Sequence, residues 1–179
     1  KPRLVKTIIG ASVAELTEGE IVASSQGVRV ISGTVLWGNT AVGPYAYLGR
    51  YHQGVALLEE GTKNEFFLKN WMGLGIHRHS ATRAFLANFI HPSTYTFNTA
   101  LNGGPRSIMP IGCYEKVLAP YGVEATMLVR AIDINDTDQA KLLGILEFSE
   151  EDIALATYVC PGKNDFGPLL RRSLTKIEV

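Results

Sequence analysis

The chain has 179 residues, and its 17 basic and 17 acidic side chains give a formal net charge of zero. This length suits one or two small domains with a sizeable core, and the balanced charge gives no electrostatic argument for a nucleic acid or an anionic membrane surface as a partner. No apolar run approaches the roughly 18 residues of a membrane-spanning helix, and two cysteines are too few for a disulfide framework, which favours a reducing compartment.

The first part of the chain, residues 1–61, predicts a small α+β unit. The run Arg3–Ile9 is rich in apolar and β-branched residues and predicts a strand. Ser12 is followed three residues later by Glu15, which is the pattern of a capping box. We therefore expect a short helix that begins after Ser12 and ends at Gly19.

Two further strands are expected in this unit. The first is Gly27–Gly33, and Thr34–Trp37 extends it after a turn or bulge. The second lies around residues 45–57, where apolar and aromatic side chains alternate along the chain. Together with the short helix, these strands predict the small α+β unit.

The middle of the chain, residues 62–105, gives weaker patterns. Ser80 begins either a short helix or an irregular segment. Thr94–Thr99 alternates as a strand does, and the turn Asn102–Pro105 is the best candidate for a linker. This stretch is therefore expected to connect two differently built domains.

Residues 106–179 predict a compact domain of five short helices. The expected helices run from Cys113 to Ala119, from Val123 to Ile132, from Asp136 to Gly144, from Ser149 to Cys160, and from about Asp165 onwards. Ser149 is a good N-cap, and Pro161-Gly162 cannot continue the helix that it starts. The last helix is amphipathic, with an apolar face of Phe166, Leu169, Leu170, Leu174 and Ile177.

Motifs spread along the whole chain match those of one family. They are Lys1–Thr7, Gly10–Thr17, Val30–Gly33, Tyr47–His52, Met109–Gly112, Asp136–Ala140 and Ile153–Lys163. On these motifs the chain resembles the NqrA subunits of sodium-translocating NADH:quinone oxidoreductases. The match is weakest between Lys63 and Asn98, and its specificity comes from the whole set of motifs.

The resemblance implies a fold and a setting that the residues alone do not establish. Residues 1–61 would be a β-grasp module of the soluble-ligand-binding (SLBB) type, and the chain would be the C-terminal part of a longer protein. The whole complex passes electrons from NADH to ubiquinone or menaquinone and exports sodium, with flavins and an iron–sulfur centre on other subunits. NqrA would lie on the cytoplasmic side of the bacterial inner membrane, docked on the membrane protein NqrB, with a part in quinone binding.

The helical domain resembles a ferredoxin-like scaffold without its metal clusters. The related protein RnfC of the Rnf electron-transport complex has two Cys-x2-Cys-x2-Cys-x3-Cys-Pro runs in this region. If Cys160 is the last position of one run, the others fall on Ala156, Ile153 and Glu150. The positions of the earlier run fall near Ile108, Ile111, Tyr114 and Leu118. We therefore expect two remnants of an internal repeat, no bound cluster, and apolar side chains in the vacated volume.

The two cysteines allow two interpretations. Cys160 is either a redox thiol close to a quinone or a core cysteine at a helix end, and Cys113 allows the same choice. Free cysteines are often buried and unreactive, which favours the core interpretation for both.

The histidines do not predict a metal site. His77 and His79 could place two ligands on one strand face, but His52 and His91 are scattered, and a metal site needs three or four ligands. Surface or capping roles are therefore favoured. A hydrolase that uses His77 and His79 is a distant alternative.

Charged and aromatic clusters likewise have structural interpretations. Glu59-Glu60 and Glu150–Asp152 are interpreted as strand-end charge and as partners of a helix dipole, with acid–base catalysis as the alternative. Arginines at four positions could meet a partner or a quinone head group, but solvated helix faces explain them as well: Arg106, Arg130, Arg171 and Arg172. Three aromatic residues form either core or a docking patch: Phe66, Phe67 and Trp71. Gly10, Gly33 and Gly103 fit no phosphate-binding motif.

The sequence thus predicts an α+β protein with three parts, residues 1–61, 62–105 and 106–179. No catalytic residue, metal ligand or cofactor-binding residue is assigned, and the chain alone is expected to be inactive. The favoured function is docking of a peripheral part of the sodium pump. The alternatives are an electron carrier of ferredoxin type, which the cysteine count disfavours, and a stand-alone ligand-binding module.

Overall fold

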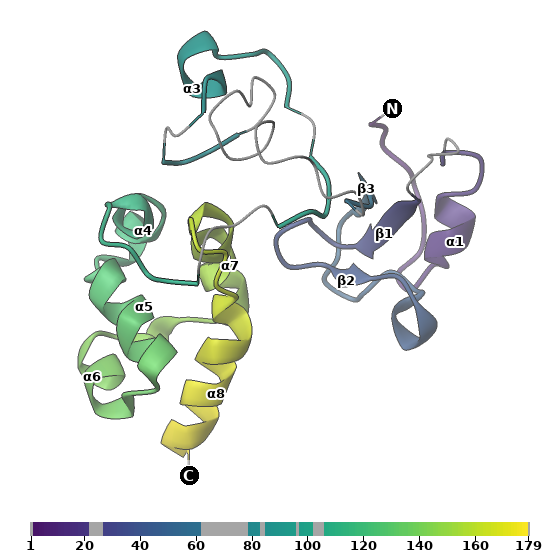
Figure 1. Cartoon of the computed structure of the whole chain (residues 1–179). Coiled ribbons are helices and arrows are strands. Elements are labelled where there is room, and N and C mark those ends of the chain that lie inside the picture. The colour runs from purple at the N-terminus through teal and green to yellow at the C-terminus, as the bar shows by residue number, and fades with distance from the viewer. Residues whose placement is uncertain are drawn as a thin grey trace. The chain divides into compact units, whose positions relative to one another are not determined.

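The computed structural model describes residues 2–21, 27–61, 79–82, 85–95, 97–101 and 106–178. The chain divides into two compact units, residues 1–66 with 96–100, and residues 67–95 with 101–179. Each unit is built around its own secondary structure (Figure 1). A small sheet with helices confirms the α+β class, whereas the three-part division stays a prediction, since residues 62–78 and 102–105 lie outside the described residues.

The first unit is a three-stranded antiparallel sheet accompanied by one short helix. Its elements are α1 (Val13–Leu16), β1 (Val28–Ser32), β2 (Asn39–Thr40), the 3-10 helix η1 (Gly43–Tyr45) and β3 (Val55–Glu59). The strand order is β2-β1-β3, so β1 is the central strand. Ile31 of β1 is paired with Thr40 on one side and with Ala56 on the other.

Local sequence explains two of the turning points in this unit. The amide of Glu15 donates to the Ser12 hydroxyl at 3.5 Å, so α1 begins at the expected cap. The hairpin between β1 and β2 closes at Gly38, where an added Cβ would lie 2.5 Å from the Ile31 side chain. A glycine is therefore required for the turn to pack against β1.

Of the strands expected in this unit, Gly27–Gly33 is confirmed as β1, and the other expectations fail wholly or in part. Arg3–Ile9 is not a strand, and its large side chains Leu4, Ile8 and Ile9 are exposed, because a β-rich run needs a neighbouring strand to pair with. Thr34–Trp37 is a turn that does not extend β1. In residues 45–57 only the last three positions belong to a strand, since Tyr45 lies in η1 and Tyr47 makes a single bridge to Ser12.

The prediction for residues 94–99 also has to be corrected. Its described residues form no strand, and Asn98 makes only an isolated bridge to Glu59. After Ser80, the described residues up to 101 contain one helix, α3 (Ala87–Ile90), which ends at a left-handed His91.

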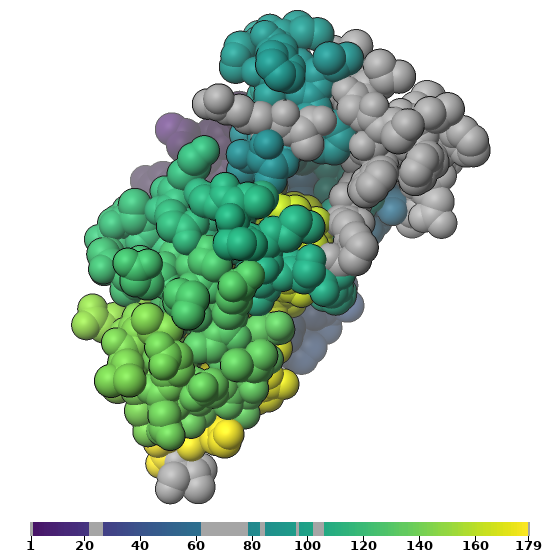
Figure 2. Space-filling view, turned by 60° about the vertical axis from the view of Figure 1, so that its left-hand side comes forward, coloured from purple at the N-terminus to yellow at the C-terminus, as the bar shows by residue number. Residues whose placement is uncertain are grey.

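The helical part of the second unit has the five helices that the sequence predicts. They are α4 (Cys113–Leu118), α5 (Ala125–Ile134), α6 (Thr137–Leu142), α7 (Glu150–Val159) and α8 (Phe166–Glu178), with 3-10 turns η2 (Ala119–Tyr121) and η3 (Ile145–Glu147). Figure 2 shows one face of this unit, on which α4, α5 and α6 form a continuous surface. The core beneath contains fully buried Tyr114, Leu128, Ile132, Ile153, Phe166 and Leu170.

Helix ends in this unit follow the predicted caps. Asp136 accepts a hydrogen bond from the amide of Gln139 at 3.1 Å and starts α6. Asp152 accepts from both the amide and the hydroxyl of Ser149, at 2.8 and 2.6 Å, and starts α7. These local contacts fix where each helix begins, so the chain turns at defined places between helices.

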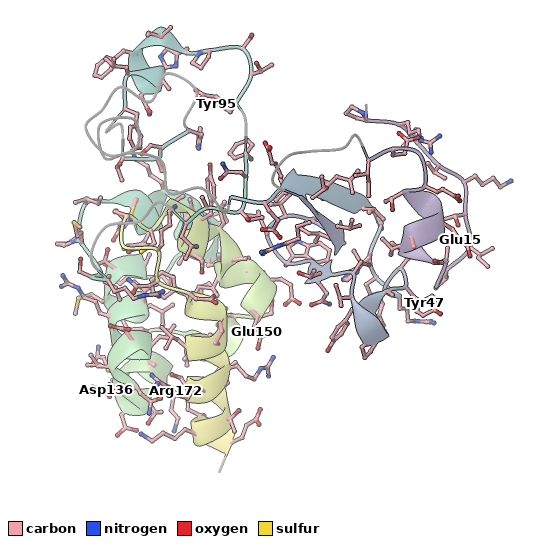
Figure 3. All side chains as sticks on the ribbon, turned by 45° about the vertical axis from the view of Figure 1, so that its right-hand side comes forward. Glu15, Tyr47, Tyr95, Asp136, Glu150 and Arg172 are labelled. Atoms are coloured by element: carbon pink, nitrogen blue, oxygen red, sulfur yellow. The ribbon has the colours of Figure 1, made fainter. Side chains whose placement is uncertain are left out.

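A second set of contacts ties α8 to the end of α5. Arg172 donates to the carbonyl of Asp133 at 3.3 Å, and Lys176 donates to the carbonyl of Asn135 at 3.5 Å. The Ser173 hydroxyl donates to the Asn135 side chain at 3.2 Å. Asn135 has a left-handed backbone with φ 58° and forms the corner between α5 and α6. The bonds from α8 hold this corner, which lies near the labelled Asp136 and Arg172 (Figure 3).

Candidate functional site

Cys160 lies at the C-terminal end of α7 and is fully buried. The Tyr114 hydroxyl donates to its sulfur at 3.2 Å, and the amide and side-chain nitrogens of Asn164 lie 3.5 Å from the same atom. The sulfur therefore accepts hydrogen bonds from both α4 and the turn that follows α7. This arrangement holds the turn against α4, which is the role of a core cysteine.

Cys113, the first residue of α4, is also buried. Burial raises the pKa of its thiol, and the neighbouring Cys160 raises it further. Burial, followed by the hydrogen bond to Cys160, raises the pKa of Tyr114. A protonated, inaccessible Cys113 has little nucleophilic or metal-binding character.

The two runs that are interpreted as remnants of cluster-binding motifs meet where α4 packs against α7. Tyr114, Leu118, Ile153 and Ala156 are fully buried there in the apolar core. Ile111 is exposed and Ile108 only packs at the edge of this core. Within the described residues, no group of three or more His, Cys, Asp or Glu side chains could hold a metal ion.

The 160–164 turn presents Lys163 beside Tyr158. The Lys163 ammonium donates to the Tyr158 carbonyl at 2.5 Å and lies 5.3 Å from the centre of the Tyr158 ring. Burial lowers the pKa of Lys163, and the proximity of Cys160 only partly opposes this shift. Lys163 has φ 52°, a left-handed conformation that is uncommon for a residue with a Cβ.

His79 lies against the same tyrosine. Its Nδ1 is 2.6 Å from the Tyr158 hydroxyl, and its ring meets the Tyr95 ring edge-on at 5.4 Å. Burial, with a smaller contribution from Tyr95, raises the pKa of Tyr158. Sequence reasoning missed this cluster of His79, Tyr158 and Lys163, because no local spacing connects residue 79 with residues 158 and 163.

The other histidines are not brought to this place. His52 lies in the first unit, where its Nδ1 is 2.9 Å from the buried Ser32 hydroxyl and its ring is 5.7 Å from that of Trp37. His91 ends α3, and His77 lies outside the described residues, as does the aromatic cluster Phe66, Phe67 and Trp71. The Ser32–His52 pair was also missed by sequence reasoning, since twenty residues separate its members.

The predicted carboxylate clusters have structural partners. Glu60 forms a two-pronged ion pair with Arg29, at 2.7 and 3.0 Å, and accepts from Thr99 at 2.6 Å. The hydrogen bond from Arg29 is the main reason why the pKa of Glu60 is lowered. Glu150 pairs with Arg171 at 2.6 Å, and Asp152 caps α7.

The four arginines singled out in the sequence also have contacts of their own. Arg171 pairs with Glu150, and Arg172 donates to α5 as described above. Arg106 donates to the carbonyl of Lys163 at 3.4 Å, and Arg130 donates to the carbonyl of Ile108 at 3.2 Å. Arg106 and Arg130 thus contact neutral carbonyl groups, whereas Arg171 is neutralised by a carboxylate.

The first unit contains a groove of about 350 Å³ beside α1. It is lined by Val13, Ala14, Thr17, Glu18, Gly19, Ile21, Val30, Ala41 and Ala46. Most of these side chains are small and apolar, so the groove offers few groups that could orient a polar ligand. Thr17, the buried polar residue in this wall, donates its hydroxyl proton to backbone carbonyls of α1.

Comparison with known proteins identifies relatives over nearly the whole chain. A family model described as "NQRA C-terminal domain" matches residues 1–43. The chain is 49% identical over 177 residues to the A subunit of the Na(+)-translocating NADH-quinone reductase of Histophilus somni strain 2336 and to that of Vibrio alginolyticus. The corresponding protein from Shewanella frigidimarina is 51% identical over 178 residues.

Each of these matches covers 99% of this chain but only 38–39% of the relative. In the described part of the chain, no helix is both long enough and apolar enough to cross a membrane. The predicted resemblance to NqrA proteins of sodium-translocating NADH:quinone reductases is confirmed over nearly the whole chain, which spans less than half the length of those relatives.

Proposed function

We propose that this chain is an assembly part of a peripheral subunit in a sodium-translocating NADH:quinone reductase, and that it carries no redox centre of its own. The observation that carries the proposal is the 49% identity over 177 residues to NqrA proteins of such enzymes. In the complex, electrons pass from NADH to ubiquinone or menaquinone while sodium is exported, and the flavins and the iron–sulfur centre belong to other subunits. The partner would be the membrane protein NqrB, met on the cytoplasmic side.

The chemistry of the described side chains supports a docking role. Both cysteines are buried, and the pKa of Cys113 is raised. The Cys113 thiol is therefore poorly suited to redox chemistry or to metal binding. The first unit exposes large apolar side chains, including Leu4, Ile8 and Tyr51. Exposed apolar groups of this kind are characteristic of surfaces that meet another protein or domain.

A deletion in the complete NqrA protein tests this role. Removal of the residues that correspond to this chain should release the remainder of NqrA from the membrane complex and abolish NADH:quinone activity. The chain alone should show no such activity. Stoichiometric iron and acid-labile sulfide in natively prepared protein, or turnover by the chain alone, would contradict the proposal.

A part in quinone binding is tested by photo-crosslinking in the intact complex. A photoreactive quinone should label peptides from residues 1–179 if this chain lines the quinone site. Labels found only in other parts of the complex would remove the chain from that site and would leave the docking role as the whole function.

The second candidate is a stand-alone ligand-binding module, and the groove beside α1 is the observation that favours it. Binding of a small apolar probe should then be reduced when Ala14 or Ala46, which line the groove, is replaced by leucine. Equal binding by the leucine variants and the unaltered chain would count against this alternative.

A further inference from the structure

Lys163 occupies an unfavourable place for a cation. Its ammonium group is half-buried beside the Tyr158 ring, and its backbone has the left-handed conformation that usually selects glycine. Its one hydrogen-bond acceptor is the Tyr158 carbonyl, which leaves two ammonium protons without an acceptor in the described part of the chain. Burying a charge without an opposite charge is costly, so this position calls for an explanation beyond packing.

Arg106 is fixed close to the same turn. Its guanidinium donates to the Lys163 carbonyl at 3.4 Å, and the Asn164 side chain donates to the Ser107 carbonyl at 3.2 Å. These two bonds join residues 106–107 to the 160–164 turn. The guanidinium itself stays exposed, with most of its donors directed to neutral groups or solvent.

His79 is the third basic side chain near the 160–164 turn. Its Nδ1 contacts the hydroxyl of Tyr158, whose ring lies against Lys163. Among the described residues, no ion pair links His79, Arg106 or Lys163 to a carboxylate. Two of these basic side chains, His79 and Lys163, therefore contact Tyr158, and the third, Arg106, contacts the backbone of Lys163.

We propose that Lys163 and His79, which contact Tyr158, form a binding site for a phosphate-type oxyanion together with Arg106, which contacts the backbone of Lys163. An oxyanion would accept the two remaining Lys163 protons and a forked pair of hydrogen bonds from Arg106, which suits the geometry of phosphate. It would also neutralise the desolvated ammonium. The phosphate group could belong to a soluble metabolite or to a phospholipid headgroup, and both sources present the same chemistry.

The test measures binding of inorganic phosphate to the full chain by titration calorimetry at constant ionic strength. R106Q and K163Q should each weaken binding by about tenfold or more, because each removes a charge-assisted hydrogen bond. K116Q is the matched control: Lys116 is exposed on α4 and outside this cluster, so its removal should leave binding unchanged. Absence of phosphate binding, or equal binding by all variants, would overturn the proposal.

A second arm separates the two sources of phosphate. Vesicles of phosphatidylcholine with about one third phosphatidylglycerol should retain the chain in a sedimentation assay if the ligand is a headgroup, and R106Q should reduce that retention. Binding of inorganic phosphate without retention on vesicles indicates a soluble ligand.

Lys163 also contacts a carbonyl at the C-terminal end of α7, where a cation stabilises the helix. If that is its whole role, K163Q lowers the melting temperature but phosphate has no effect on either protein. The R106Q variant keeps the test valid if K163Q fails to fold, because Arg106 is exposed and, within the described residues, donates only to a carbonyl. Failure here would leave the docking function untouched, since that function rests on the similarity to NqrA proteins.

Discussion

The two units of the chain are stabilised in different ways. In the second unit, α4, α5, α7 and α8 share one continuous apolar cluster that includes Tyr114, Leu128 and Phe166. In the first unit, Val13 and Ile31 are the buried hydrophobic residues among those described, and polar Thr17 and Ser32 are buried beside them. The second unit has the core of an independent domain, whereas the first depends strongly on individual hydrogen bonds.

The difference has a simple origin in the sequence. Amphipathic helices with regular spacing bury one face each and together produce a contiguous core. The first unit has a three-stranded sheet with one two-residue strand, and it leaves apolar side chains such as Ile8 and Ile9 on its surface. A unit of this kind gains stability when another part of a protein covers the exposed side chains.

The largest predicted effect tests the apolar core of the second unit. Phe166→Ala removes a fully buried ring that contacts Tyr114, and it should lower the free energy of unfolding by about 3–5 kcal/mol. Denaturant unfolding followed by helical circular dichroism measures this loss. The matched control is Ile8→Ala at an exposed site of the first unit, which should change stability by less than about 0.5 kcal/mol. A similar loss for both variants would remove the distinction between the units.

The next effect tests the polar interior of the first unit. The Ser32 hydroxyl contacts His52, accepts from the amide of Gly49 at 3.2 Å, and lies 3.4 Å from the Tyr47 carbonyl. Ser32→Ala leaves these groups without their partner and should destabilise this unit by about 1–3 kcal/mol. Hydrogen exchange should detect the change in β1 and β3, while exchange in α5 and α8 stays as before. Altered exchange in the helices would mean that the units do not unfold separately.

A smaller effect is expected at the corner between α5 and α6. Asn135→Ala places a less suitable residue in a left-handed conformation and removes the bond from Ser173, for a loss of about 1–2 kcal/mol. Asn135→Gly relieves the backbone cost and should recover part of the stability. Thermal unfolding of both variants provides the comparison, and equal melting temperatures would show that the conformation carries no cost.

The smallest effect is a dependence on pH in the second unit. Hydrogen bonds from Ser149, then from Tyr121, lower the pKa of Asp152 below its ordinary value of 3.8. Burial tends to raise the pKa of Glu115, but the hydrogen bonds from Thr126 and from the backbone amide of Glu115 together outweigh this and lower it. Both carboxylates therefore contribute stability above about pH 4 that is lost as the pH falls through their folded pKa values.

Asp152→Asn isolates one part of this dependence. It should cost about 0.5–1 kcal/mol at about pH 7 through the weakened cap, and it should flatten the loss of stability between about pH 4 and pH 2. Urea unfolding at a series of pH values measures both changes. A variant with the same pH profile as the unaltered protein would show that the capping box does not titrate.

Sequence reasoning succeeded where structure is determined locally. The caps at Ser12, Asp136 and Ser149 and the amphipathic face of α8 were all predicted from spacing within a few residues. The proposed strand Arg3–Ile9 failed because strand formation depends on a partner that the run itself does not specify.

The candidate sites show the same limit more strongly. The chemical character of Cys113 and Cys160 as core residues follows from how such residues usually behave. The cluster of His79, Tyr158 and Lys163 joins positions 79 residues apart and more, and no periodic pattern marks it. Its basic groups become informative only once the fold shows which charges lack an opposite charge.

The clamp that α8 places on Asn135 has a consequence for the order of folding. The corner between α5 and α6 receives Arg172, Ser173 and Lys176 from a helix that is made about forty residues later. During synthesis this left-handed corner therefore lacks its contacts from α8 until the ribosome has released that helix. The helical unit should accordingly fold only after its final helix emerges, so that a stalled nascent chain lacking α8 remains sensitive to protease.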